Sequence, residues 1–222
     1  MRKLTIALAT VLVVGGVTFA AGSPAMAATS KVSVVHGIPG QPVDVYVNGN
    51  KTLDNFKPGD IAGPLDLEQG SYDIALTKPG EPVGNAIVTL DNATIPGGAN
   101  VSIVAHLNAG GTPQITAFPN NTTGLPAGKA RLVVRHTAAA PAVDVRANGT
   151  PVVTNLTNPN EAQADVDPGT VKADVVLAGT NNVVIGPANL NLAEGTSTIV
   201  YAYGSAANQT LALAVQTISG LR

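Results

Sequence analysis

Hydrophobic and polar residues alternate with a period of two through much of the chain. The segment from Val43 to Val47 reads V-D-V-Y-V, and the dipeptide Asn48-Gly49 follows it directly. A period of two places successive side chains on opposite faces of a β-strand. Asn-Gly is a strong hairpin signal, because both residues tolerate the positive φ angles that a type I′ turn requires. The pattern therefore predicts two strands joined by a tight turn.

The same alternation continues on both sides of Gly70. The stretch from Leu65 to Leu67 precedes this glycine, and Tyr72 to Leu76 follows it, with an apolar residue at every second position. Two further segments, 100–106 and 210–217, are apolar and are also predicted to be strands. Proline and glycine interrupt the pattern about every ten residues, a spacing typical of a sandwich or barrel. Since no segment after residue 27 has a convincing helical period, the sequence predicts an all-β fold.

The chain also contains an internal repeat. The segment from Val34 to His36 returns at Val134 to His136, and Val43 to Gly49 returns at Val143 to Gly149, both with an offset of 100 residues and no gap. Further along the chain the offset falls slightly, as short loop deletions within a duplicated unit would cause. Each unit has the length of a small sandwich domain with seven or eight short strands. We therefore predict two tandem β-sandwich domains of the immunoglobulin-like or transthyretin-like class.

The two predicted domains occupy residues 28–119 and 130–222. Residues 120–129 between them are polar and rich in turn-forming residues, as expected of a linker. Residues 1–27 are predicted to be a secretory signal peptide that precedes the first domain. The mature protein would therefore consist of two related domains and a short connection.

The predicted signal peptide has the parts that export requires. Arg2 and Lys3 form a basic start, an apolar stretch runs from Leu4 to Ala20, and Ala25-Met26-Ala27 supplies the small residues before a cleavage site. The apolar stretch approaches the length of a membrane anchor, but the helix-breaking residues that follow it favour cleavage after Ala27. We expect a secreted bacterial protein with no membrane span after signal cleavage. Since no sortase motif or apolar tail follows the second unit, we expect it to be extracellular or loosely associated with the cell wall.

The composition excludes several classes of function. The chain has no cysteine, which excludes disulfide bonds, thiol catalysis and cysteine-rich metal sites. Its 12 Lys and Arg residues stand against 14 Asp and Glu residues with no basic cluster, so neither nucleic acid nor anionic lipid is an expected partner. The chain also has no tryptophan and only 4 Tyr and 3 Phe residues, which predicts a core of Val, Leu, Ile and Ala.

The opening of each unit carries a sequence motif. Residues 35–49 read V-H-G-I-P-G-Q-P-V-D-V-Y-V-N-G, and residues 136–149 read H-T-A-A-A-P-A-V-D-V-R-A-N-G. The first segment resembles the opening of the family called domain of unknown function 4397 (DUF4397), which runs close to V-H-x-x-P-x-x-P-x-V-D-V-Y-V-x-G. Residues 136–149 resemble the same opening but depart from it at Ala140 and Arg146. The stretch from Leu65 to Leu76 also fits the family, and the resemblance implies a secreted or surface-located bacterial protein without an agreed activity.

One pair of titratable residues occurs in both units: His36 with Asp44, and His136 with Asp144. In the structural interpretation, the carboxylate holds an imidazole N–H or caps loop amides that would otherwise be unpaired. The alternative is half of a metal site or a catalytic His–Asp dyad. A metal site needs three or four ligands, and each unit offers at most one more obvious candidate. We therefore favour the structural role and predict neither a metal nor a cofactor.

Motifs for catalysis are poorly represented. No G-x-S-x-G nucleophile elbow occurs, and all four glutamates lie in turn-like segments, which argues against the paired acids of a glycoside hydrolase. Tyr46 is the one aromatic residue on the strand face opposite the valines, and Arg146 replaces it in the second unit. A flat sugar-binding platform is therefore not expected, and Tyr46 is kept as a candidate contact residue.

These features predict that the protein is not an enzyme and has no catalytic residues. The favoured function is a secreted binding or structural module of the bacterial cell envelope, with an unidentified protein or cell-wall component as its partner. Edge strands and hairpin loops would carry the contact. The alternative is a small-ligand or metal-binding protein that uses the repeated His–Asp pairs.

Overall fold

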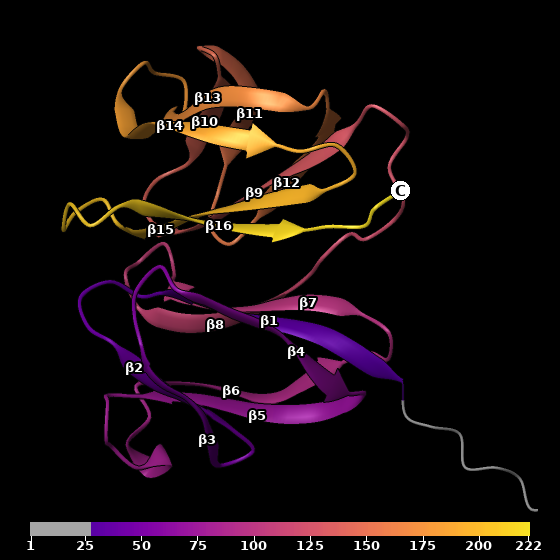
Figure 1. The fold of residues 1–222 in the computed structure, drawn as a ribbon. Helices are drawn as coiled ribbons and strands as arrows, with labels where there is room; N and C mark the ends of the chain where they lie inside the picture. The colour runs from indigo at the N-terminus through magenta and orange to yellow at the C-terminus, as the bar shows by residue number, and fades with distance from the viewer. Residues whose placement is uncertain (1–27) are drawn as a thin grey trace, which may run out of the picture.

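The computed structural model describes residues 28–222, so the predicted signal peptide and its cleavage site lie outside the described residues. The described part of the chain contains 16 β-strands and one short 3₁₀ turn, η1 (Val83–Asn85). The strands form four sheets of four strands each, two in each half of the chain (Figure 1). The all-β fold with two tandem β-sandwiches is therefore confirmed.

The first sandwich contains two sheets with strand orders β4-β1-β7-β8 and β3-β2-β5-β6. Its strands are β1 (Thr29–Gly37), β2 (Val43–Val47), β3 (Asn50–Phe56), β4 (Ile61–Glu68), β5 (Gly70–Thr77), β6 (Val88–Ile95), β7 (Asn100–Leu107) and β8 (Pro113–Pro119). The second sandwich repeats both orders as β12-β9-β15-β16 and β11-β10-β13-β14. Its strands are β9 (Ala130–Ala139), β10 (Val143–Ala147), β11 (Thr150–Leu156), β12 (Glu161–Val166), β13 (Gly169–Leu177), β14 (Val183–Leu192), β15 (Ser197–Ser205) and β16 (Ala212–Ile218).

The first strand of each sandwich lies inside its sheet rather than at an edge. β1 pairs antiparallel with β4 and parallel with β7, and β9 pairs in the same way with β12 and β15. In an immunoglobulin constant domain the first strand lies at the end of the ABED sheet. Of the two sandwich classes predicted from the sequence, the observed strand order therefore leaves the transthyretin-like one.

The Asn-Gly turns have the geometry that the sequence predicts. Asn48 and Gly49 have φ angles of 49° and 76° and join β2 to β3, while Asn148 and Gly149 have φ angles of 51° and 82° and join β10 to β11. Both central residues of each turn thus have positive φ, as a type I′ hairpin requires. These two-residue turns fix the register of the hairpins that carry Asp44 and Asp144.

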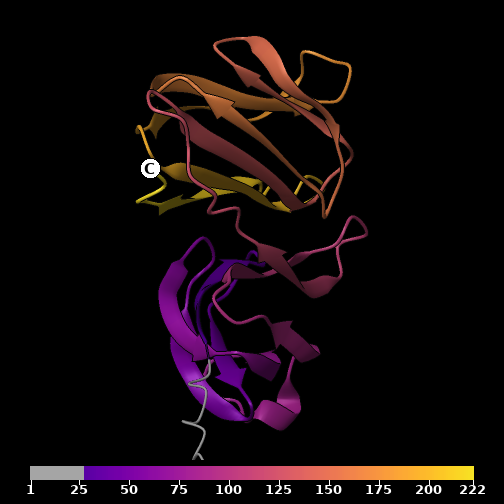
Figure 2. The same ribbon diagram turned by 90° about the vertical axis from the view of Figure 1, so that its right-hand side faces the viewer.

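The two sandwiches are stacked, so that the β1-containing sheet of the first faces the β9-containing sheet of the second (Figures 1 and 2). Each sandwich has a core of its own between its sheets. A third group of buried residues combines apolar side chains of both inner sheets, namely Val35, Val104, Phe118, Val133, Ile199, Tyr201, Tyr203 and Ala214. We call the contact between these two inner sheets the seam.

The seam explains why the inner strands lack a polar face. Every residue of β9 and of β15 is buried, as is every residue of β7 except its first. A strand that is covered on both faces has no solvent side, so it lacks a regular alternation of polar and apolar residues. The apolar segment predicted as a strand at 100–106 is such a strand. The charged residues that β9 does contain, Arg131 and Arg135, are buried and hydrogen-bonded to carboxylates.

Candidate functional site

His36 is fully buried near the end of β1, and both of its ring nitrogens bond to the loop that follows. Nε2–H donates to the carbonyl oxygen of Gln41 (3.1 Å), and Nδ1 accepts from the amide of Ile38 (3.4 Å). The ring also stacks on Phe56, with 6.0 Å between the ring centroids. Burial lowers the pKa of His36 and outweighs the opposite effect of the Gln41 carbonyl. The neutral imidazole therefore holds the loop between β1 and β2.

Asp44 lies on β2 and accepts hydrogen bonds from two other segments. Its carboxylate accepts from the amides of Asn55 (3.0 Å) and Gly80 (2.9 Å) and from Nζ of Lys51 (2.6 Å). Burial alone would raise the pKa of Asp44, but Lys51 and the two amides lower it to about 2. The ionised carboxylate thus ties β3 to the loop after β5. No hydrogen bond joins Asp44 to His36 among the described residues, so the structure does not bring them together as a dyad.

The second sandwich repeats both arrangements. His136 donates to the carbonyl oxygen five residues later (3.0 Å) and accepts from the amide two residues later (3.4 Å), as His36 does. Asp144 accepts from the amides of Asn155 (2.7 Å) and Gly179 (2.9 Å). Burial lowers the pKa of His136, and the two amides lower the pKa of Asp144. In both copies the polar atoms of the repeated pair are used by loop backbone.

The metal-ligating side chains do not cluster. Within residues 28–222, no group of three or more His, Asp or Glu side chains is arranged to hold a metal ion. The histidines that the sequence offers as ligands also present no unused nitrogen, because each ring bonds to backbone on both sides. The geometry therefore offers neither a ligand set nor a free imidazole base at these positions.

Tyr46 and Arg146 occupy matching places on β2 and β10, and each reaches the loop at the end of its sheet. The Tyr46 hydroxyl donates to the carbonyl oxygen of Glu81 (3.0 Å). Arg146 donates twice to Asp174 (2.7 and 2.8 Å) and once to the side chain of Asn181 (3.1 Å). The two units therefore hold the same loop with different chemistry, and the hydroxyl of Tyr46 is already engaged within the fold.

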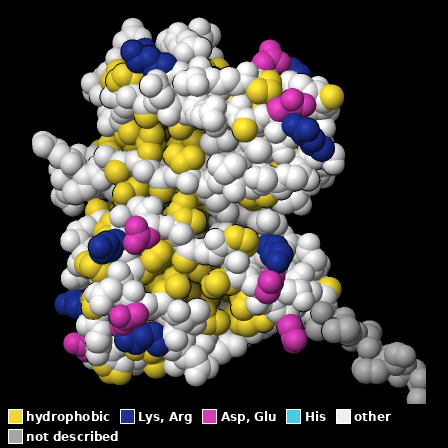
Figure 3. All heavy atoms as spheres, in the orientation of Figure 1, with side chains coloured by type: hydrophobic (Ala, Val, Ile, Leu, Met, Phe, Trp, Pro, Cys, Tyr) yellow, Lys and Arg dark blue, Asp and Glu magenta, His cyan; other side chains and the backbone are white. Residues whose placement is uncertain are grey.

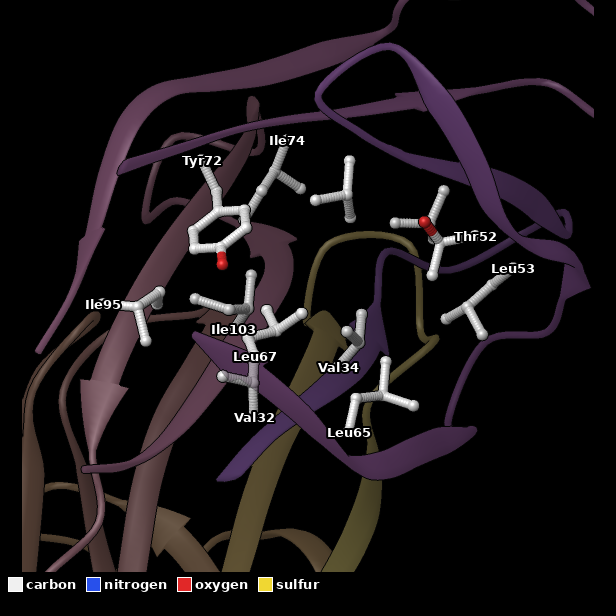
Figure 4. A pocket seen from close by; sticks show the side chains of 12 residues that line it. Val32, Val34, Thr52, Leu53, Leu65, Leu67, Tyr72, Ile74, Ile95 and Ile103 are labelled. Carbon is white, nitrogen blue, oxygen red and sulfur yellow. The ribbon is translucent and has the colours of Figure 1, made fainter. Parts of the chain in front are cut away.

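Each sandwich has an apolar cleft between its two sheets, beside the edge strands β3 and β4 or β11 and β12. In the first sandwich the cleft has a volume of about 90 Å³, and Val34, Leu53, Leu65 and Tyr72 are among its lining residues (Figure 4). In the second, a cleft of about 180 Å³ is lined by the matching Val134 and its neighbours. Figure 3 shows hydrophobic side chains gathered in a hollow of each sandwich. The size of each cleft depends on the distance between the two sheets. The alternation of residues along one strand does not determine this distance, so the sequence did not predict the clefts.

Arg135, with 1% of its surface exposed, is the largest of the fully buried side chains and lies at the seam. Its guanidinium donates to Glu161 (2.7 Å), to the Tyr201 hydroxyl (2.9 Å) and to the side chain of Asn120 (2.9 Å). It also lies 4.6 Å from the ring centroid of Phe118, which belongs to the first sandwich. Sequence reasoning missed this residue, although the change from valine to arginine between the two units is visible in the repeat.

Gln216 extends the polar network across the seam. Its side-chain amide donates to the hydroxyl of Ser33 (3.0 Å) and its Oε1 accepts from the hydroxyl of Ser102 (3.0 Å). Elsewhere at the seam, the side chain of Asn158 donates to the carbonyl oxygen of Leu107 (2.8 Å). Side-chain hydrogen bonds as well as apolar packing therefore fasten the two sandwiches to each other.

His106 is the third histidine of the chain, and sequence reasoning did not single it out as a site residue. Its Nδ1–H donates to the carbonyl oxygen of Leu107 (2.9 Å), and Nε2 accepts from the Thr116 hydroxyl (2.9 Å) and the Gln114 amide (3.1 Å). Burial lowers the pKa of His106, and the nearby His136 lowers it further. All three histidines are therefore buried, hydrogen-bonded and neutral.

Comparison with known proteins gives a family but no activity. No curated protein matches this chain. One similar solved structure is that of a proposed cell adhesion protein from Bacteroides ovatus ATCC 8483, with 10% identity over 86% of this chain and 98% of that chain. Its TM-score of 0.28 is too low to support an argument about function. Within residues 28–222, no helix is long and apolar enough to cross a membrane.

The family match covers the first sandwich and the start of the second. The model of the family described as "Domain of unknown function (DUF4397)" matches residues 30–146, which is more than half of the chain. This stretch contains the motif of residues 35–49 and ends within β10. The resemblance noted for residues 35–49 and for the stretch from Leu65 to Leu76 is therefore confirmed, and the chain belongs to the DUF4397 family.

Proposed function

We propose that this protein is a secreted, non-enzymatic binding or structural module of the bacterial cell envelope. The observation that carries the proposal is the use of the repeated His–Asp pairs. Their ring nitrogens and carboxylates are bonded to loop backbone in both sandwiches, so they are occupied in holding the fold. A catalytic base or a metal ligand needs a lone pair that faces a substrate or an ion.

The joined sandwiches support a mechanical or scaffolding role. The seam combines buried apolar residues with hydrogen bonds from Gln216 and Arg135. Interfaces between domains of one chain are often small and polar, and they permit relative motion. A contact that buries an arginine and several large apolar side chains instead favours one fixed arrangement, which suits a protein that presents its outer edges to a partner.

The size of the apolar cleft in the first sandwich favours a protein partner over a free small ligand at that site. The cleft of the first sandwich has a volume of about 90 Å³. For comparison, a dry apolar cavity of roughly 150 Å³ binds benzene. The first cleft can therefore accept little more than one apolar side chain, which suits an anchor residue of a bound partner.

Binding to isolated cell envelopes tests this proposal. We expect the purified protein to sediment with envelopes, and we expect Leu65→Lys to weaken this, because it places a charge in the cleft of the first sandwich. Thr89→Lys is the matched control, since it adds the same charge on β6, an exposed position at the opposite edge. Equal retention of both variants would exclude the cleft as the contact.

A metal-binding assay distinguishes the proposed function from the alternative, in which the repeated His–Asp pairs bind a metal ion. Under the proposal, the purified protein binds no stoichiometric Zn²⁺ by isothermal titration, and His36→Ala lowers the melting temperature. If Zn²⁺ bound with one site per sandwich, and His36→Ala removed one site without changing the melting temperature, the repeated pairs would be ligand sites. A protein that failed to sediment with any envelope fraction and bound metal in this way would overturn the proposal.

A further inference from the structure

The outer edge of β16 has no backbone partner among residues 28–222. β16 (Ala212–Ile218) pairs along one side with β15 and forms the end of the sheet β12-β9-β15-β16. No backbone group of these seven residues makes any other hydrogen bond in the described part of the chain. An edge strand of this kind presents a row of free N–H and C=O groups, which is a template for another strand.

β16 differs from the other edge strands of the four sheets in its sequence. Natural edge strands are protected against pairing by prolines and charged side chains. Each of the other seven edge strands carries such residues: Lys51 and Asp54 in β3, Pro64 in β4, Asp91 in β6, Pro113 and Pro119 in β8, Pro151 in β11, Glu161 and Asp165 in β12, and Pro187 in β14. β16 reads A-L-A-V-Q-T-I and has neither a proline nor a charge.

The matching strand of the first sandwich makes the contrast direct. β8 holds the same place as β16, and by its register against the preceding strand Ala117 corresponds to Val215. β8 begins with Pro113 and ends with Pro119, so it lacks N–H groups at both ends. In the second sandwich Thr217 stands where Pro119 does. The same strand position is therefore protected in one copy and open in the other.

The sequence on both sides of β16 is also nearly free of charge. Residues 175–193 and 195–221 contain no Asp, Glu, Lys or Arg, so Glu194 is the one charged residue between Val175 and Leu221. Val215 in the middle of β16 is 46% exposed, and Val183 on the edge strand β14 is 42% exposed. Two copies of this edge can therefore approach each other without opposing like charges.

We propose that a second copy of this chain pairs with the outer edge of β16, antiparallel and about a twofold axis at Val215. In this register Val215 lies opposite its own counterpart, and Leu213 lies opposite Thr217 on the same face of the sheet. The interface is isologous, so each copy satisfies the other's free edge and leaves no new edge exposed. The sheets β12-β9-β15-β16 of the two copies then form one continuous sheet of eight strands. This inference goes beyond the proposed function and does not depend on envelope binding.

Single cysteines test the register, because the native chain contains none. On the axis, the two Cβ atoms of Val215→Cys are about 5 Å apart, close enough to form a disulfide after a small adjustment. Two Thr217→Cys side chains would lie about 13 Å apart, since each strand residue advances about 3.3 Å. We expect mild oxidation to convert Val215→Cys almost completely to a covalent dimer. Thr217→Cys and the matched Ala117→Cys should remain monomeric on a non-reducing gel.

Sedimentation equilibrium tests the pairing without a cross-link. We expect the native protein to be a dimer and Val215→Lys to be a folded monomer with an unchanged circular dichroism spectrum, because Val215 is half exposed and an edge lysine opposes strand pairing. Ala117→Lys should leave the dimer intact. A native protein that stays monomeric at its highest soluble concentration would overturn the inference. So would equal cross-linking of the three cysteine variants, or a Val215→Lys protein that remains dimeric.

Discussion

The two sandwiches meet through the same sheet of the fold but bring different chemistry to the seam. The first contributes Val35 and Phe118, whose matching positions in the second are Arg135 and Gln216. Apolar packing alone fixes an arrangement weakly, whereas hydrogen bonds between unlike faces are satisfied in only one orientation. Two copies of one fold can therefore form a specific contact through the same sheet, provided that the residues at matching positions of that sheet differ between the copies.

Arg135 and Glu161 are expected to have the largest effect on this contact. In the first sandwich, β1 pairs with β4 through Val35 and Ile61, and the second places Arg135 and Glu161 at the same two positions. Arg135→Ala removes a buried cation and leaves its acceptors unpaired, which we expect to destabilise the protein by about 3–5 kcal/mol. Urea unfolding followed by circular dichroism measures this loss.

The matching substitutions show whether charge or packing is responsible. Val35→Ala, on the apolar side, should cost about 2 kcal/mol, because it removes only buried methyl groups. The double variant Arg135→Val with Glu161→Ile copies the apolar pair of the first sandwich and should recover much of the stability that Arg135→Ala loses. A double variant as unstable as Arg135→Ala would mean that Arg135 acts through Asn120 and Tyr201 rather than through Glu161.

The local structure of each sandwich was predictable, whereas the seam was not. The alternation around Val45 and the Asn48-Gly49 turn depend on neighbours in sequence, so they fix strands and hairpins without tertiary information. The side chain of Arg135 instead finds its partners at Asn120, Glu161 and Tyr201, which the chain brings together only after both sandwiches form. A repeat detected in a sequence reveals that two units exist but does not reveal which faces they share.

Asp44 and Asp144 are buried carboxylates at matching positions, and they differ in whether a lysine is their partner. Asp44 has Lys51 as a partner, whereas Pro151 occupies the matching position beside Asp144. Asp44→Ala leaves the amides of Asn55 and Gly80 unpaired and should cost about 3 kcal/mol. Asp144→Ala should cost less in the same unfolding measurement, since no cation loses its partner.

The loss of folding stability at acid pH provides a second test of the role of the Asp44 carboxylate. Its pKa of about 2 lies below the ordinary value of 3.8, so the unfolded chain binds the proton more readily than the folded protein does. The stabilisation is fully present above pH 3.8 and is lost as the pH falls towards 2. Asp44→Asn should flatten the pH dependence in this window, and an unchanged slope would show that the carboxylate is not stabilised by its partners.

The roles of Asp44 and His36 were predictable in kind but not in their partners. Strand parity places Asp44 on the face opposite Val43 and Val45, and its repetition indicated that a loop amide needs an acceptor. Its partner Gly80 lies 36 residues further along the chain, in a loop that β5 brings beside β2. Pairing between strands that are distant in sequence decides such contacts, and no pattern within one segment contains it.

The two sandwiches differ in their number of buried histidines, which affects how stability depends on pH near neutrality. The first sandwich contains His36 and His106, and the second contains His136, with Tyr203 at the position that matches His106. Burial lowers the pKa of all three histidines below 6.5, so between that value and the lowered one the unfolded chain binds more protons than the folded protein. Stability is therefore complete above pH 6.5 and falls as the pH decreases below it.

The hydrogen bonds of His36 explain why stability falls as the pH decreases, and a variant of His106 tests this dependence. Protonation of His36 places a second N–H against the amide of Ile38, so a hydrogen bond is replaced by two opposed donors. Each histidine can contribute a slope of at most about 1.4 kcal/mol per pH unit. Measured between about pH 5 and 7.5, around the ordinary histidine pKa, the slope for His106→Gln should be lower than that of the native protein. An identical slope would mean that folding does not lower the pKa of His106.

Tyr46 and Arg146 should show the smallest difference, because both lie at the surface side of their sheets. Tyr46→Phe removes one exposed hydrogen bond to Glu81 and should cost about 0.5 kcal/mol. Arg146→Ala should cost more in thermal unfolding, because Arg146 makes three hydrogen bonds and two of them go to the ionised Asp174. Tyr46→Arg gains no such partner, since Ala75 pairs with Tyr46 where Asp174 pairs with Arg146. If Tyr46→Phe left stability unchanged but reduced sedimentation with envelopes, Tyr46 would be a contact residue rather than a loop clamp.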